Sequence, residues 1–272
     1  MTGSIIRKGY IDTADGQVHY RAAGVSGPSL VMLHQTASSS RMYESVMPAL
    51  ADHFTVWAFD TPGFGASFQP VEPPTTSTYA RVLHEAIRAT CPLGAHLVGH
   101  HTGAGIACEI AATWPTTVTS LLMIGSLALG PEERIRWRAG VKGSPPRQDG
   151  GHLLEIWDRV ANIDSQPIAF PPNVVVRQRE TVDNLLATRW HEAYLAVFDQ
   201  DFEGLLKRVQ CPITLASGPA DVLFPYVTAA LEARPDMKFI ELPGGAYVFD
   251  DHPERMVREI MRMTDDSDSL QS

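Results

Sequence analysis

Residues 96–105 read HLVGHHTGAG, and this stretch decides the fold. A short apolar run ends at Gly99, a sharp turn follows through His101, and small residues then open a helix-like segment. Gly99 and Gly103 flank one central residue at the spacing G-x-Nuc-x-G, where Nuc is the residue at the apex. A strand-turn-helix of this kind strains its central residue, so that the side chain projects from the end of the sheet. His101 is that residue.

The remaining chain alternates short apolar runs with helix-like stretches, which is typical of a parallel sheet with helices on both faces. An amphipathic pattern predicts a helix over 77–91. The expected strands are 17–22, 29–34, 54–59, 96–99, 121–125, 213–217 and 238–242, of which the first alternates like an antiparallel strand.

The pattern changes to amphipathic helices between residues 130 and 209, broken by paired prolines and glycines. We interpret 130–209 as a helical lid, inserted into a core formed by 1–129 and 210–272. Insertions at the carboxyl ends of parallel strands cover the ligand site of such sheets. Aromatic and histidine side chains of this lid either face the pocket or form the core of a small helical subdomain: His152, Trp157, Trp190, His191 and Tyr194.

Composition limits the classes of function. The 272 residues are 44% hydrophobic and 19% charged, which is ordinary for one globular domain, and the formal net charge is -9. This charge argues against binding nucleic acid or an anionic membrane, because both need clustered cations. Three scattered cysteines suggest no disulfide framework, and no stretch resembles a signal peptide or reaches the roughly 18 apolar residues of a membrane span. We therefore expect a soluble cytoplasmic protein, with a small-molecule substrate as its partner and no particular oligomeric state indicated.

Four segments in the right order resemble the α/β-hydrolase superfamily. Besides the stretch around His101, they are LVMLHQT at 30–36, AFDTPGFGAS at 58–67 and PITLASGPADVLFP at 212–225. The resemblance runs from about residue 17 to 263. It implies a mostly parallel sheet flanked by helices with an inserted helical lid, an α/β fold.

The resemblance also assigns roles to residues. The two amides that hold an oxyanion would come from Thr36 and Thr102, and Asp221 stands where the family keeps its acid. His34 and Gln35 lie in the same loop as Thr36, where His34 would brace the loop. Gln35 replaces a usual glycine and would either shape the loop or enter the pocket.

Two departures from the family pattern bear on the chemistry. His101 stands where most members carry Ser, Asp or Cys. In PGGAYVFDDHPE at 243–254, Ala246 stands where the catalytic histidine is expected. Using His252 instead would break the match of Pro253 and Glu254, so His252 is the weaker candidate for a base.

His101 is longer than the serine usual at its position, and Ala246 is shorter than the histidine usual at its position, so the two volumes are roughly exchanged. If the His101 imidazole leans into the space left at Ala246, it reaches Asp221 directly and forms a His-Asp dyad. Such a dyad would act as general base or as nucleophile on an activated ester, lactone or related carbonyl compound, without a cofactor.

Three other interpretations stay open at this stage. The same dyad would serve a lyase, isomerase or decarboxylase that only moves protons, and loss of Ser and His also fits a non-catalytic ligand-binding protein. His34, His100 and His101 form a three-histidine metal set only on a weaker interpretation, because usual ligand spacings are missing. We expect no metal, and we expect His100 to pack beneath the turn.

Overall fold

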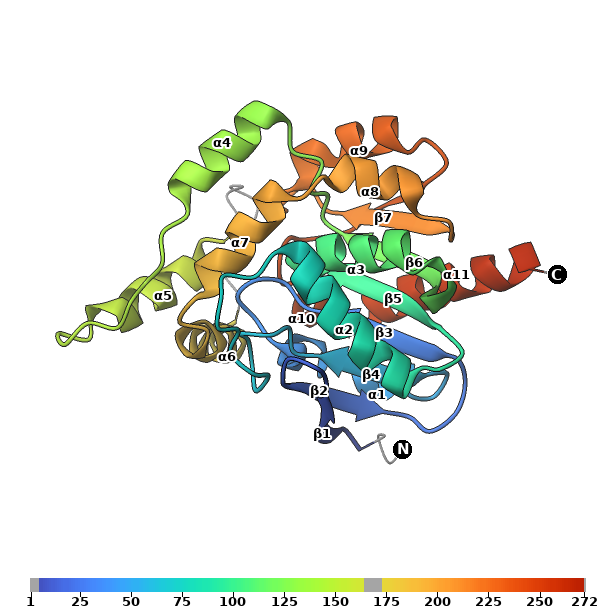
Figure 1. The fold of residues 1–272 in the computed structure, drawn as a ribbon, viewed down its shortest axis with the longest axis horizontal. Coiled ribbons are helices and arrows are strands. Elements are labelled where there is room, and N and C mark those ends of the chain that lie inside the picture. Colours follow the sequence, from blue (N-terminus) through green and yellow to red (C-terminus); the bar gives the residue numbers. More distant parts are fainter. Residues whose placement is uncertain (1–4, 164–172, 272) are drawn as a thin grey trace.

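The structure, a computed structural model, describes residues 5–163 and 173–271. Its centre is one eight-stranded sheet in the order β1-β2-β4-β3-β5-β6-β7-β8 (Figure 1). β1 and β2 run antiparallel to their neighbours, and all other pairings are parallel. The strands are β1 (Arg7–Asp12), β2 (Gln17–Ala23), β3 (Ser29–Leu33), β4 (Thr55–Phe59), β5 (Ala95–His100), β6 (Val118–Ile124), β7 (Ile213–Ser217) and β8 (Lys238–Glu241).

This architecture confirms the predicted fold class. Each strand expected from the sequence is present, with ends that differ by a few residues at most. The structure also contains one strand, β1, that the sequence did not indicate. None of its residues is buried, so it lacks the half-buried alternation that marks a strand in a sequence.

The central strands bury residues on both faces of the sheet. In β3, Val31 and Leu33 pack into one hydrophobic cluster, and Leu30 and Met32 pack into the other. This alternation follows from the two-residue repeat of a strand. It explains the continuous apolar runs in the sequence, because a strand covered by helices on both faces needs no polar side.

Helices cover both faces. One hydrophobic cluster includes residues of α2 (Thr76–Thr90), α3 (Thr102–Thr113), α8 (Phe202–Arg208) and α9 (Val227–Ala233). The other includes residues of α1 (Met47–Leu50), α10 (Val248–Asp251) and α11 (Pro253–Gln271). Short 3-10 turns lie at η1 (Ser40–Tyr43), η2 (Pro115–Thr117) and η3 (Phe224–Tyr226).

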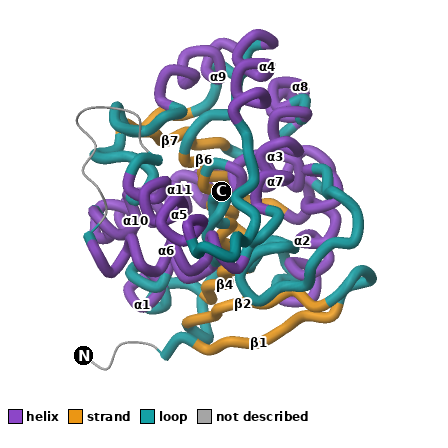
Figure 2. The backbone as a smooth tube through the Cα atoms, turned by 90° about the vertical axis from the view of Figure 1, so that its left-hand side faces the viewer, coloured by secondary structure: helices purple, strands orange, loops and turns teal. Residues whose placement is uncertain are grey.

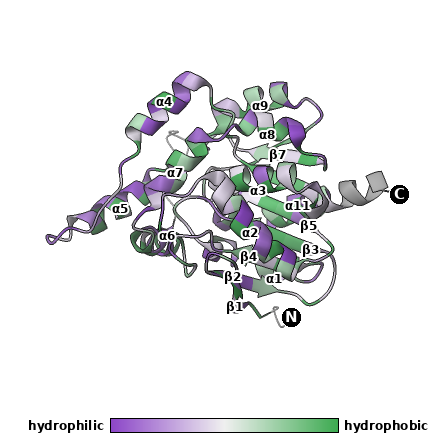
Figure 3. Cartoon of the chain, in the orientation of Figure 1, coloured by the Kyte–Doolittle hydropathy of each residue, from purple (hydrophilic) through white to green (hydrophobic). Residues whose placement is uncertain are grey.

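The segment between β6 and β7 holds α4 (Pro131–Gly140), α5 (Gly151–Ala161), α6 (Val174–Leu186), α7 (Trp190–Asp199) and α8. Figure 2 shows α5 and α6 on the side of the molecule that faces the viewer. α4 has no buried residue, and much of its surface is hydrophilic in Figure 3. α8 packs mainly on α3, and α7 contacts both α2 and α3.

The strand order places the candidate site. After β3 the chain goes to β4 on one side of β3 and then to β5 on the other. The loops after β3 and β5 consequently leave the same end of the sheet in opposite directions, and such a switch point opens a crevice for ligands. Among the described residues, no helix combines the length and apolar character needed to cross a bilayer.

Candidate active site

His101 occupies the sharp turn between β5 and α3. Its backbone φ is 48° and ψ is -110°, and within the described residues it is the one non-glycine residue with positive φ. Such a conformation is costly for a residue with a side chain and is typical of functional turns. The His101 amide donates to the Ile124 carbonyl of β6 at 2.8 Å, which fixes the turn to the sheet.

The small neighbours of His101 let strand, turn and helix approach closely. A Cβ on Gly103 would lie 2.0 Å from the Leu33 carbonyl oxygen, so only glycine fits between α3 and the end of β3. The Ala104 and Gly105 amides donate to the His101 carbonyl, so the Thr102 amide has no acceptor within its own helix. This amide and the dipole of α3 favour negative charge near the turn.

The His101 imidazole lies on the carboxylate of Asp221. Nε2 is 3.0 Å from Oδ1 and 2.9 Å from Oδ2. Asp221 follows β7 and is 1% exposed, and the Leu223 amide donates to its Oδ1 at 2.8 Å. The dyad suggested by the sequence is therefore present as a contact between these two side chains.

Electrostatics decide which ring nitrogen carries the proton. Burial raises the pKa of Asp221, but the charge and hydrogen bond of His101, together with the Leu223 amide, outweigh burial and leave the pKa below its ordinary value. An ionised carboxylate only accepts hydrogen bonds, so Nε2 of His101 is the donor. In the neutral ring the lone pair then belongs to Nδ1. In a Ser-His-Asp relay the two nitrogens have the opposite roles.

His100 lies beneath the turn. Its ring is fully buried, meets His101 edge-on at a centroid distance of 4.5 Å, and neither ring nitrogen has a hydrogen-bond partner. Burial, followed by the charge of His101, holds the pKa of His100 well below its usual range, so the ring is neutral. One ligand atom from each of His100, His101 and Asp221 lies within 4.8 Å of the others.

His34 does not join that group. Its Nδ1 lies 2.8 Å from the Gln35 carbonyl, and the Thr61 amide donates to its Nε2 at 3.0 Å. Both nitrogens are thus used to brace the loop after β3. The set His34, His100 and His101 considered from the sequence does not come together.

Ala246 lies in the loop between β8 and α10 and is completely buried. Its carbonyl accepts a hydrogen bond of 3.1 Å from Nε2 of Gln35. Gln35 is also buried, so its side chain connects two loops of the site and does not line the cavity. His252 is the C-cap of α10 and does not line the cavity either.

α6 holds the loop that carries Thr36. Ser38 donates to Glu180 at 3.1 Å, Ser39 donates to Asp183 at 2.7 Å, and Asn184 donates to the Ala37 carbonyl. These acceptors and donors of α6 are all buried. α6 thereby holds the backbone of the loop that contains Thr36.

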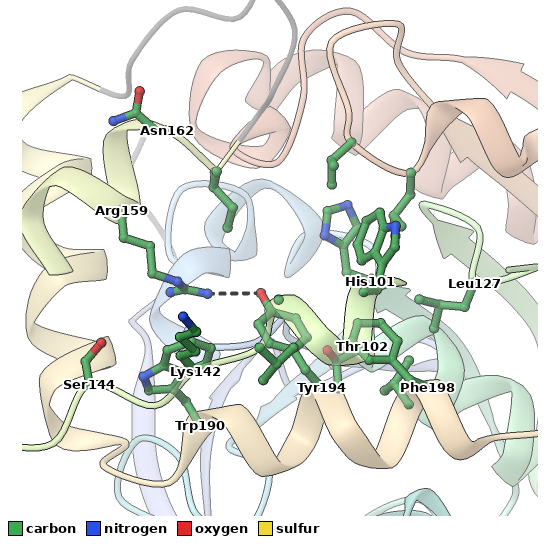
Figure 4. Close-up of a pocket in the computed structure, with 17 residues that line it drawn as sticks. His101, Thr102, Leu127, Lys142, Ser144, Arg159, Asn162, Trp190, Tyr194 and Phe198 are labelled. Atoms are coloured by element: carbon green, nitrogen blue, oxygen red, sulfur yellow. Dashed lines mark hydrogen bonds between the residues drawn. The ribbon is translucent and has the colours of Figure 1, made fainter. Parts of the chain in front are cut away.

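A cavity of about 510 Å³ lies over the dyad (Figure 4). His101 and Thr102 line it from the sheet end, and Leu223 lines it from the Asp221 loop. Residues 130–209 contribute four aromatic side chains, Trp137, Trp190, Tyr194 and Phe198, together with the polar side chains of Lys142, Ser144, Arg159 and Asn162. The site is therefore a mostly apolar chamber with a few polar groups and the dyad at its wall, as expected for a small organic ligand.

Known proteins with similar sequences and structures share the fold of this chain. Residues 28–151 match the family described as alpha/beta hydrolase fold. A fluoroacetate dehalogenase of Burkholderia sp. is 26% identical, over 92% of this chain and 92% of that protein. A 2-(acetamidomethylene)succinate hydrolase of Mesorhizobium japonicum is 35% identical over 36% of each chain. The crystal structure of an enol-lactonase from Burkholderia xenovorans superposes with a TM-score of 0.78 at 18% identity, covering 94% of this chain and 99% of that one.

The chain therefore has the α/β-hydrolase fold. It resembles enzymes, and the relatives named above include hydrolases of different substrates. The similarity therefore indicates an enzyme, and a hydrolase in particular.

The helices between β6 and β7 bring some of the predicted residues to the cavity and leave others outside. Trp190 and Tyr194, both on α7, line it. Trp157 stacks instead under Arg177, with the guanidinium 4.1 Å from the ring centroid, and His152 accepts from the Arg147 amide at the surface. His191 follows Trp190 on the helix, so it points elsewhere and packs against Gly143.

The sequence did not single out several residues that line the cavity. Lys142 and Arg159 come from the lid, and Leu223 comes from the turn after Asp221. No local motif marks them. Lys142 and Arg159 reach the cavity through the packing of α4, α5 and α7, which a single sequence does not specify.

Proposed function

We propose that this protein hydrolyses a small ester, lactone or related activated carbonyl compound without a cofactor, with His101 and Asp221 as its catalytic dyad. The observation that carries the proposal is the contact between His101 Nε2 and the buried carboxylate of Asp221, at the wall of an apolar cavity. Asp221 fixes the tautomer and stabilises the imidazolium that forms when Nδ1 takes a proton.

In the first route His101 is a general base. Nδ1 removes a proton from water as the water oxygen attacks the carbonyl carbon. The Thr102 and Thr36 amides hold the developing oxyanion, and the protonated ring then returns its proton to the leaving oxygen. A positioned base contributes about 10² to 10⁴-fold and one oxyanion donor about 10² to 10³-fold, which suits reactive esters better than amides.

In the second route His101 is the nucleophile. Nδ1 bonds to the carbonyl carbon, the leaving oxygen departs with the electron pair of the broken bond, and water then hydrolyses the acyl-imidazole to the acid. This route needs no second histidine, which fits Ala246 at the position where the family keeps one. Mass spectrometry of the enzyme quenched during turnover separates the routes, because only the second adds an acyl group to His101.

The test is turnover of 4-nitrophenyl esters and small lactones by the wild type, His101→Ala and His252→Ala. We expect His101→Ala to lose about 10² to 10⁴-fold in kcat/KM and His252→Ala to keep the wild-type value. Treatment with EDTA should leave the rate unchanged. Failure of the wild type to turn over any of these compounds would contradict the proposal.

Parallel reactions in ¹⁸O-labelled water and in D2O test the reaction type. Hydrolysis places solvent oxygen in the product. Proton transfer as in a lyase, isomerase or decarboxylase instead places solvent deuterium on substrate carbon, without solvent oxygen, and that result would overturn hydrolysis while keeping His101 as a base.

A further inference from the structure

The cavity carries positive charge at the end contributed by the lid. Arg159 of α5 and Lys142 of the α4–α5 connection both line it, whereas no Asp or Glu does so among the described residues. Figure 4 shows both cations on the side of the cavity away from His101 and Leu127. This charge runs against the net charge of -9 for the whole chain, so it is a local feature of the cavity.

Neutral groups hold Arg159 in place. Its guanidinium carbon lies 4.0 Å from the centroid of the Trp190 ring, a cation-π contact, and its NH2 donates to the Tyr194 hydroxyl at 3.2 Å. NH1 donates to the side-chain oxygen of Asn184. Within the described residues Arg159 forms no ion pair with a carboxylate. The half-buried guanidinium is thus oriented but not neutralised.

Arg177 provides a comparison within the same lid. It also stacks on a tryptophan, with 4.1 Å to the Trp157 centroid, but it pairs with the carboxylate of Asp158 at 3.0 Å and does not line the cavity. An arginine of this segment can therefore stack on a tryptophan and still pair with a carboxylate. The difference is that Arg159 faces the cavity.

The remaining donors of Arg159 suit a carboxylate. A guanidinium has five N–H donors in a planar fork that matches the two oxygens of a carboxylate, and two of its nitrogens already donate to Tyr194 and Asn184. Lys142 is exposed at the cavity wall and adds a second, mobile cation. A bound anion would supply the charge that the protein does not provide.

We infer that Arg159, assisted by Lys142, binds a carboxylate of the substrate, so that the compound cleaved at His101 is an ester or lactone that also carries a carboxylate group. The inference rests on the proposed function for the reaction that this binding serves. The apolar walls between the two ends would hold the carbon chain or ring that separates the carboxylate from the reacting carbonyl.

Turnover of two matched esters tests the inference. Mono(4-nitrophenyl) adipate and 4-nitrophenyl hexanoate have the same chain length and differ in the terminal carboxylate. We expect wild-type kcat/KM to favour the adipate ester by about tenfold or more, Arg159→Gln to abolish the preference and Arg159→Lys to keep part of it. An unchanged preference in Arg159→Gln would overturn the inference, and so would a wild type that prefers the hexanoate ester.

Binding without turnover separates this inference from the proposed function. Calorimetric titration with 3-phenylpropanoate and with its neutral amide should show tight binding of the acid only. His101→Ala should keep that binding, and Arg159→Gln should weaken it about tenfold or more. If no ester is hydrolysed but the acid still binds through Arg159, the proposed function fails and the anion site stands. Equal affinity for acid and amide would remove the anion site.

Arg177→Gln is the matched control, because it removes a stacked arginine from the same lid outside the cavity. It should leave both the ester preference and the binding of 3-phenylpropanoate at wild-type values. Melting temperatures of Arg159→Gln and Arg177→Gln report loss of folding. A loss of preference in Arg177→Gln equal to that in Arg159→Gln would assign the effect to lid structure and contradict a carboxylate contact.

Discussion

The hydroxyl of Tyr194 donates a 2.8 Å hydrogen bond to the backbone carbonyl of Thr36. The same oxygen accepts from Arg159. Tyr194 therefore connects the lid cation to the loop after β3, which carries one of the proposed oxyanion amides.

Tyr194→Phe should remove this connection while keeping the aromatic ring in the cavity wall. We expect kcat to fall about fivefold with little change in KM, because the hydrogen bond positions the loop that contains Thr36 and contributes about 1 kcal/mol net. Steady-state kinetics measure the effect. Tyr226→Phe is the control, since its hydroxyl accepts from Arg136 outside the cavity lining. A fall in Tyr226→Phe of the same size would argue against a specific role for Tyr194.

Gly125→Ala should displace the His101 ring. The added Cβ would lie 2.5 Å from Cδ2 and 3.0 Å from Nε2 of His101, so the ring could not keep its contact with Asp221. Gly63→Ala is the matched control, because Gly63 also has positive φ, of 87°, but a Cβ there meets nothing closer than 3.5 Å. We expect both variants to lose about 1 kcal/mol or more of folding free energy, and only Gly125→Ala to lose activity. Full activity in Gly125→Ala would show that the dyad contact is dispensable.

Glu180 is a buried acid on α6. Burial, together with the charge of Asp183, raises the pKa of this carboxyl to about 7 against the opposing effects of Arg179 and Ser38. Arg179 is itself paired with Asp250. Between an unfolded pKa of about 4.3 and the folded pKa, the folded state holds a proton that the unfolded state has lost. The contribution of Glu180 to the free energy of unfolding is therefore present at low pH, and it is lost as the pH rises through the pKa of the folded state.

Glu180→Gln, which cannot titrate, should accordingly be more stable than the wild type at pH 8. The difference should be about 3 kcal/mol at pH 8 and fall to about 1 kcal/mol at pH 5, where the folded wild type holds the proton but the unfolded chain has mostly lost it. Denaturant unfolding at the two pH values measures it. Glu155→Gln, an exposed residue of α5, should show no such pH-dependent gain. A variant that is less stable than the wild type at pH 8 would reverse the sign and contradict the account.

The double variant His101→Ser with Ala246→His should exchange the dyad for a Ser-His-Asp relay. We expect gain of labelling by a fluorophosphonate, which reacts with an activated serine, together with loss of the native reaction. Intact mass spectrometry detects the label, and His101→Ser alone serves as the control that lacks the relay histidine. Absence of labelling in a folded double variant would place the family histidine at a position other than Ala246.

Local signals explain what the sequence could predict. The turn at His101 depends on a run of neighbouring residues, whose small side chains are required by close backbone approach, so it can be recognised from the sequence. Asp221 follows a strand that is buried on both faces, and its place in the strand order brings it to the same sheet end. These two features can be predicted without knowing how the helices pack.

Features set by packing could not be predicted. Whether a lid side chain faces the cavity depends on the rotation of its helix, so Trp157 and Trp190 look alike in sequence but only Trp190 lines the cavity. Arg159 resembles other lid arginines until the neighbouring helices show that it lacks a carboxylate partner among the described residues. β1 was not predicted because none of its side chains is buried, so its sequence lacks the alternation of a half-buried strand.

The most direct test of the account is chemical rescue of His101→Ala by free imidazole. The rate of 4-nitrophenyl acetate hydrolysis is measured as imidazole is added, after subtraction of the reaction of imidazole with the ester in solution, and the same titration is made with the double variant His101→Ala and Asp221→Asn. The account predicts saturable rescue in His101→Ala that is strongly reduced when the carboxylate is also replaced. Undiminished hydrolysis by His101→Ala before any imidazole is added would contradict it.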